Sequence, residues 1–212
     1  VLERCLDSIY ENIPLSRLIV VDGFSTDRTL SILKKYREKQ GNVTLVPNVD
    51  TRAMARQKGI ELVNTEWFMF VDSDVVLYKD WFKKAERCIA PKVGAIWGVE
   101  VPANPQVFRL AVSMMKTRNL TLPMLMMKNF EIRGGTHDVL IRTDAVKDIK
   151  IPEDLRIYED TYIKKWIERK GYKALAVESP HCIHFRLAQM QRFSLKSAFL
   201  LVALETKYRF LN

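Results

Sequence analysis

Two aspartates interrupt an apolar stretch in the first half of this chain. Residues 67–71 read Trp-Phe-Met-Phe-Val, Asp72-Ser73-Asp74 follows, and apolar residues resume at 75–77. A continuous apolar run is typical of a buried strand, and ligands of open α/β sheets bind beyond the carboxyl ends of such strands. In an extended chain Asp72 and Asp74 face the same side, so they can share one hard divalent cation. The spacing therefore predicts a cation site, and the alternative is that both acids cap a following helix.

The elements that must position these aspartates alternate between short strands and helices. The pattern predicts strands at 18–21, 43–46 and 67–71, and helices at 2–9, 28–39 and 51–62. Strand–helix alternation of this kind is typical of a doubly wound parallel half-sheet. The rest of the chain predicts helices at 78–89 and 161–169, and strands at 93–101, 139–141 and 174–177. We therefore expect a single α/β domain.

Composition narrows the class of protein. The chain has 212 residues and 34 basic against 25 acidic side chains, a net charge of +9. This charge suits nucleotide phosphates, nucleic acid or an anionic membrane surface and does not choose among them. Cys5, Cys88 and Cys182 are odd in number and widely spaced, which argues against a disulfide framework or a zinc site and favours a reducing compartment.

Neither a membrane span nor a secretory leader is predicted. The longest uninterrupted apolar stretch, 198–204, is far below the roughly 18 residues that a spanning helix needs. No signal-peptide pattern opens the chain, and we expect a cytoplasmic location. Because residue 1 is a valine and already begins an amphipathic pattern, we also expect that an upstream segment has been left out.

Four short motifs, in this order, carry a resemblance to a known family: Asp22-Gly23-Phe24-Ser25-Thr26-Asp27, Asp72-Ser73-Asp74, Gly134-Gly135 and Glu159-Asp160. Over most of residues 1–185 the chain resembles the inverting glycosyltransferases of family 2, which have the GT-A fold. The resemblance implies a mixed, mostly parallel sheet flanked by helices. It implies a domain at 1–186, with a nucleotide-binding half at 1–92 and an acceptor half at 93–186. The first strand of the family would then lie upstream.

The resemblance also assigns roles in donor binding. Asp22 would hydrogen-bond the nucleotide base, although Gly23 and Phe24 stand where the family has an acidic residue and a glycine. The alternative for Ser25 and Asp27 is that they cap the following helix. Arg56 would approach the donor, and Gly134 with Gly135 would let the backbone come close to sugar and acceptor.

The metal ligands also follow from the same resemblance. Asp74 and Asp72 would hold Mn²⁺ or Mg²⁺ against the diphosphate of the donor, where the cation stabilises the charge that develops on the leaving group. His184 would be a third ligand, ahead of His181, and the alternative is that both histidines are structural. His137 is a weaker candidate for the acceptor site.

Asp160 would be the general base that takes a proton from the acceptor hydroxyl, so that a single displacement inverts the sugar. The alternative for Glu159 and Asp160 is that acidic side chains favour a helix N-terminus and that Asp160 pairs with Lys164.

The resemblance implies a UDP- or GDP-sugar as donor and a glycan or polyprenyl-phosphate lipid as acceptor. The C-terminal extension, 187–212, interleaves basic and apolar residues, which suits an amphipathic helix on the inner face of the cell membrane. A docking helix or a dimer contact would look the same. The methionine-rich stretch 114–127 is read as core, with a site for a lipid tail as the alternative.

Two other functions stay open at this stage. A haloacid-dehalogenase-type phosphohydrolase would use Asp72 as nucleophile and Asp74 as acid, but that fold places the motif on the first strand of the domain. A nucleic-acid-binding domain would rest on the net charge alone. No predicted helix has a dense basic face, so we expect no nucleic-acid partner.

Overall fold

The computed structural model describes residues 1–47, 50–119, 121, 124, 134–185 and 207–208. The predicted amphipathic extension at 187–212 and much of the methionine-rich stretch lie outside the described residues. Among the described helices, none is both long and apolar enough to cross a membrane.

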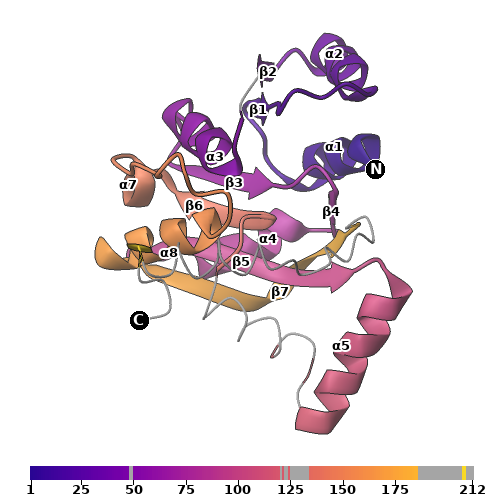
Figure 1. The fold of residues 1–212 in the computed structure, drawn as a ribbon, viewed down its shortest axis with the longest axis vertical. Coiled ribbons are helices and arrows are strands. Elements are labelled where there is room, and N and C mark those ends of the chain that lie inside the picture. The colour runs from indigo at the N-terminus through magenta and orange to yellow at the C-terminus, as the bar shows by residue number, and fades with distance from the viewer. Residues whose placement is uncertain (48–49, 120, 122–123, 125–133, 186–206, 209–212) are drawn as a thin grey trace.

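The described strands form two sheets (Figure 1). In the smaller sheet β1 (Leu18–Val21) pairs in parallel with β2 (Val43–Val46). The larger sheet has the order β3-β6-β5-β7-β4. Its strands are β3 (Trp67–Val71), β4 (Val75–Leu77), β5 (Val93–Pro102), β6 (Asp138–Arg142) and β7 (Lys173–His184).

The fold class is the expected mixed α/β domain with a central sheet, but the pairing contains more antiparallel neighbours than the strand–helix pattern predicts. β6 lies between β3 and β5 and is antiparallel to both, and β4 is antiparallel to β7. β5 and β7 form the parallel pair of this sheet. The predicted three-strand parallel half-sheet is divided, because β3 pairs with β6 in the larger sheet while β1 and β2 form their own.

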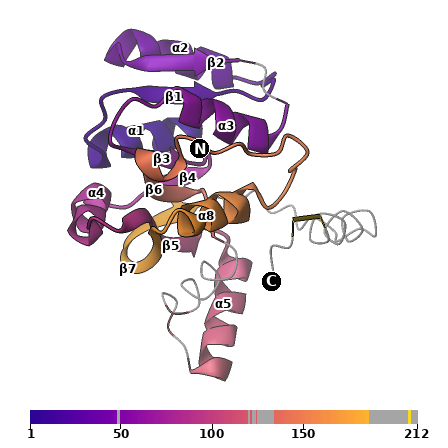
Figure 2. The ribbon, with the colours of Figure 1, turned by 90° about the vertical axis from the view of Figure 1, so that its left-hand side faces the viewer.

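Five of the described helices cover the two faces of the larger sheet. The described helices are α1 (Leu2–Asn12), α2 (Thr29–Gln40), α3 (Arg52–Glu61), α4 (Trp81–Ala85) with the 3-10 turn Glu86–Cys88, α5 (Pro105–Arg118), α7 (Thr143–Val146) and α8 (Glu159–Arg169). Cluster contacts place α3, α7 and α8 on one face and α1 and α4 on the other. Helix α5 projects away from the sheet (Figure 2).

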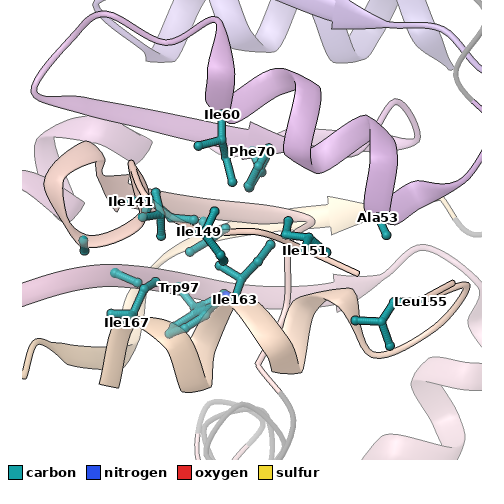
Figure 3. Packing of buried hydrophobic residues seen from close by; sticks show 14 residues of the cluster. Ala53, Ile60, Phe70, Trp97, Ile141, Ile149, Ile151, Leu155, Ile163 and Ile167 are labelled. Carbon is teal, nitrogen blue, oxygen red and sulfur yellow. The ribbon is translucent and has the colours of Figure 1, made fainter. Parts of the chain in front are cut away.

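Strand alternation explains which side chains each face buries. Phe70, Trp97 and Ile141 point to one face, where Figure 3 shows them beside Ile60 of α3 and Ile163 of α8. The neighbours Ile96 and Leu140 point to the opposite face and join Cys5 and Ile9 of α1. Because successive residues of a strand alternate between faces, one sheet supplies both cores. Burial of these side chains fixes where the strand ends lie.

Two predicted elements differ from the structure. The helix predicted at 78–89 starts at Trp81, because Asp80 before it has a left-handed backbone (φ 61°), and it turns into a 3-10 turn after Ala85. The last strand was predicted to end at residue 177 and continues to His184. His181 and His184 therefore lie within β7 and not after it.

Candidate metal and donor site

Asp72, Asp74 and His184 come together at one end of the larger sheet. One ligand atom from each of the three residues lies within 4.8 Å of the others. The register of β4 and β7 causes this, since Val75 lies opposite His184 and the Phe185 N–H donates to the Asp74 carbonyl at 2.8 Å. His184 Nε2 is 3.2 Å from Asp74 Oδ1. Two carboxylates and one imidazole form a donor set that a divalent ion such as Mn²⁺ accepts.

Arg56 of α3 reaches the same cluster. Its Nη2 contacts Oδ1 of Asp72 and donates to Thr136 Oγ1 at 3.0 Å. The guanidinium lies 4.7 Å from the ring centroid of Phe70, and only 16% of the side chain is exposed. Packing against the ring and two polar contacts therefore aim this cation at the predicted metal ligands. The structure places Arg56 beside Asp72, and its role toward a donor stays a prediction.

His184 has a second partner on its other ring nitrogen. Nδ1 lies 2.9 Å from Oε1 of Glu100, which belongs to β5. Burial alone would lower the pKa of His184, but the hydrogen bonds to Asp74 and Glu100 outweigh it and raise the pKa to about 9. Glu100 was not predicted as a site residue. The sequence did offer a signal, because it is the one charged residue in the apolar segment 93–102.

The segment 134–138 lies between the candidate metal ligands Asp72, Asp74 and His184, called the metal cluster below, and the predicted general base Asp160. Thr136 binds Arg56, and the carbonyl of His137 accepts the main-chain N–H of Asp72 at 3.1 Å. Gly134 has a left-handed backbone (φ 76°), and a Cβ on it would lie 3.3 Å from the carbonyl oxygen of Asp160. The carbonyl of Gly135 accepts from Trp97 Nε1. Gly134 thus lets this segment pass close to helix α8.

Asp160 lies in the first turn of α8. Its Oδ1 accepts the N–H of Thr161 at 2.8 Å, so part of its carboxylate is used by its own helix. The predicted alternative pair with Lys164 is not what the structure contains, since Lys164 Nζ binds Glu168 at 2.6 Å. Glu159 is buried, and its pKa is raised by that burial and then by the charge of Asp160. Arg52 approaches Glu159 at 3.8 Å.

Asp22 stands apart from the metal cluster in its hydrogen bonding. It ends β1 and is buried, its N–H donates to the Val46 carbonyl at 2.8 Å, and its Oδ2 accepts the N–H of Ser25 at 3.0 Å. Phe24, at the position where the family has glycine, adopts φ 65° and is 56% exposed. The loop therefore keeps a backbone that glycine would favour although the residue has changed.

The other two histidines, His137 and His181, have different surroundings. His181 points to the face of β7 opposite Cys182 and His184 and stacks on Tyr78, with ring centroids 4.3 Å apart. His137 is buried, and its Nε2 lies 3.0 Å from Asp138 Oδ1. Asp138 Oδ2 accepts from Trp81 Nε1 at 3.0 Å. His137 therefore belongs to the interior beside the metal cluster, and His181 does not.

The fold and this site define a class of protein, the GT-A glycosyltransferases. A mannosyltransferase from Pyrobaculum calidifontis, in complex with GDP-Man and Mn²⁺, superposes with a TM-score of 0.66 at 21% identity, covering 89% of this chain and 54% of that one. Glucosyl-3-phosphoglycerate synthase from Mycobacterium tuberculosis, with Mn²⁺ and UDP-Glc, superposes with a TM-score of 0.61 at 16% identity, covering 97% of this chain and 73% of that one.

The sequence comparisons make the assignment more specific. The family model of glycosyl transferase family 2 matches residues 1–116, and this chain belongs to that family. An uncharacterised glycosyltransferase of Haemophilus influenzae is 33% identical over 82 residues, which are 38% of this chain and 32% of the relative. A poly(ribitol-phosphate) β-glucosyltransferase of Bacillus spizizenii is 34% identical over 79 residues, 34% of this chain and 12% of the relative. The matches thus span a third or less of these curated relatives.

Family membership favours the glycosyltransferase interpretation over the two alternatives. The motif Asp72-Ser73-Asp74 follows β3, which comes after β1 and β2 in the chain. A phosphohydrolase of the haloacid-dehalogenase type would have it on the first strand, so the order of the strands also argues against that function.

Proposed function

We propose that this chain transfers a sugar from a nucleoside-diphosphate sugar to an acceptor hydroxyl, with inversion and with the help of a divalent metal ion. The observation that carries the proposal is the convergence of Asp72, Asp74 and His184, with Arg56 beside them. Carboxylates and an imidazole that meet within one coordination sphere fit Mn²⁺ or Mg²⁺. When bound there, the cation would supply stabilisation of the negative charge that develops on the departing diphosphate.

The residues of the chain then have separable tasks. Asp72, Asp74 and His184 hold the metal, and Arg56 adds a fixed positive charge for the diphosphate. Asp160 accepts the proton of the attacking hydroxyl. Asp22 at the end of β1 hydrogen-bonds the nucleotide base.

Gly134 keeps the segment that joins these groups close to helix α8. Gly135 beside it lets the backbone come close to sugar and acceptor. In this scheme residues 1–92 bind the nucleotide and residues 93–186 receive the acceptor.

Donor and acceptor are proposed as classes. The donor is a UDP- or GDP-sugar, since the structural neighbours contain UDP-Glc and GDP-Man. The acceptor is the hydroxyl of a glycan or of a lipid-linked polyprenyl phosphate. The extension at 187–212 would bring the domain to a membrane surface that carries such a lipid.

A thermal-shift panel tests the proposal. The purified chain is heated with UDP, UDP-glucose, GDP or GDP-mannose, each with Mn²⁺ or with EDTA. A nucleotide at about 100 times its dissociation constant stabilises by about 2.7 kcal/mol, or roughly 5–10 °C for a domain of this size. We expect that shift for one base and only with Mn²⁺.

The variant Asp74→Ala should lose the metal-dependent shift. The matched control is Asp144→Ala, which removes an exposed aspartate from a surface pair with Lys147 and should keep the shift. Equal stabilisation by every nucleotide with EDTA present would refute a metal-dependent site.

A further inference from the structure

A mostly enclosed carboxylate lies behind the candidate metal ligands. The side chain of Glu100 on β5 is 15% exposed and faces two imidazoles. Its Oε1 lies 2.9 Å from His184 Nδ1, and its Oε2 lies 3.9 Å from His137 Nε2. The two imidazole rings stack with centroids 5.6 Å apart and an interplanar angle of 25°. Glu100 therefore hydrogen-bonds the ring of His184 and lies near the ring of His137, and the planes of the two rings are nearly parallel.

Strand register explains why this carboxylate meets His184. In the parallel pairing of β5 with β7, Glu100 lies opposite Cys182 and Pro102 lies opposite His184. Residues two apart on a strand face the same side, so the side chains of Glu100 and His184 share one face of the sheet. The contact is thus built by backbone pairing and does not depend on a mobile surface chain.

The contact also fixes which ring nitrogen faces the aspartates. An ionised carboxylate can only accept hydrogen bonds, so the nitrogen beside Glu100, Nδ1, carries the proton. The other nitrogen, Nε2, points to Asp74 at 3.2 Å. A histidine that binds a metal commonly donates its second N–H to a carboxylate, which fixes the ring orientation and raises its basicity as a ligand.

We propose that Glu100 is a positioning residue that holds the imidazole of His184 with Nε2 toward the Asp72–Asp74 pair. The inference rests on the proposed function, because it concerns the same metal site. It adds a residue that touches neither metal nor donor and acts through His184.

His137 lies on the other side of Glu100. Its carbonyl oxygen accepts the main-chain N–H of Asp72 at 3.1 Å, and its Nε2 lies 3.0 Å from Asp138 Oδ1 and 3.9 Å from Glu100 Oε2. Removing a carboxylate from water costs free energy unless it is paired, and the hydrogen bond between Glu100 and His184 offsets part of that cost.

The experiment measures Mn²⁺ alone, without donor. The dissociation constant of Mn²⁺ is obtained from the electron paramagnetic resonance signal of the free ion, and pulsed spectra of the bound ion report a coordinated nitrogen. Three variants are compared: Glu100→Asp, which keeps the charge but is one methylene shorter; Glu100→Gln, which keeps the length but not the charge; and the control Glu66→Gln. Glu66 is an exposed acid paired with Arg142, so this control removes an equal charge elsewhere.

We expect Glu100→Asp and Glu100→Gln to weaken Mn²⁺ binding about 10- to 100-fold and to reduce the nitrogen modulation, while Glu66→Gln leaves both unchanged. Thermal unfolding without metal verifies that each variant is folded. If Glu100→Asp binds Mn²⁺ as the parent does and keeps the nitrogen modulation, charge suffices and the positioning role is overturned. If the parent chain itself binds no Mn²⁺, the proposed metal site fails, and that outcome is distinct from the first.

Discussion

Replacing Gly134 by alanine tests the link between the glycine pair and the helix that carries Asp160. Gly134 has φ 76°, and a new Cβ would lie 3.2 Å from the Cβ of Lys164 and 3.3 Å from the Asp160 carbonyl oxygen. The left-handed backbone alone costs an alanine about 1–2 kcal/mol. The close approach to α8 adds an overpacking cost of about 1–3 kcal/mol, because two backbone-anchored atoms must move.

Gly171→Ala is a matched control within the same chain. Gly171 also has a left-handed backbone, φ 81°, but a Cβ there would meet no atom within 4 Å. Gly171→Ala therefore has the free-energy cost of a left-handed alanine but not the cost of a Cβ placed too close to its neighbours. For a domain of this size each kcal/mol lowers the melting temperature by about 2–4 °C, so we expect a loss of roughly 2–8 °C for Gly171→Ala and a larger loss for Gly134→Ala.

Gly134→Ala should also transfer sugar more slowly than Gly171→Ala. A shift of a few tenths of an ångström at the start of α8 moves Asp160 relative to the acceptor, and we expect Gly134→Ala to transfer sugar about tenfold more slowly. Gly171→Ala should keep the parental rate. The assays are thermal unfolding and release of the nucleoside diphosphate at saturating donor. Equal stability and equal rates for both variants would refute the reasoning.

Two further predictions use the contacts around the site. Arg56→Met keeps a long apolar side chain beside Phe70 but removes the guanidinium that lies over the ring, and with it the charge. Mn²⁺ binding should persist while stabilisation by nucleoside diphosphate falls; isothermal titration measures both, and unchanged nucleotide affinity would contradict the proposed role. Burial, and then the charge of Asp160, raise the pKa of Glu159, so its favourable contribution to stability is present below the unfolded pKa near 4.5 and is lost as pH rises through the folded-state pKa. Glu159→Gln should therefore gain stability relative to the parent between pH 4 and pH 7 in urea unfolding, and the same gain in the control Glu38→Gln, at an exposed position of α2, would count against burial as the cause.

Local patterns predicted the early elements well because their causes are local. The strands at 18–21 and 43–46 coincide with β1 and β2, and the predicted helix 51–62 contains α3. Residues next to each element mark its ends, such as Thr51, the N-cap of α3, whose side chain accepts the Met54 N–H. The order of strands in the larger sheet was not readable in this way, since β6 enters between β3 and β5 from more than 30 residues further along the chain.

The site shows the same division between local and distant causes. The Asp72-Ser73-Asp74 motif was visible because both acids belong to one turn, whereas Glu100 meets His184 only through the parallel register of β5 and β7. Phe24 shows the converse: its sequence departs from the family, yet the loop keeps a glycine-like φ of 65°. The Ser25 N–H donates to Asp22 Oδ2 and the Thr29 N–H donates to Asp27 Oδ1, and these two hydrogen bonds fix the two sides of that loop. The flanking polar groups thus hold the loop in a left-handed conformation at Phe24, and the ring of Phe24 is exposed on its surface.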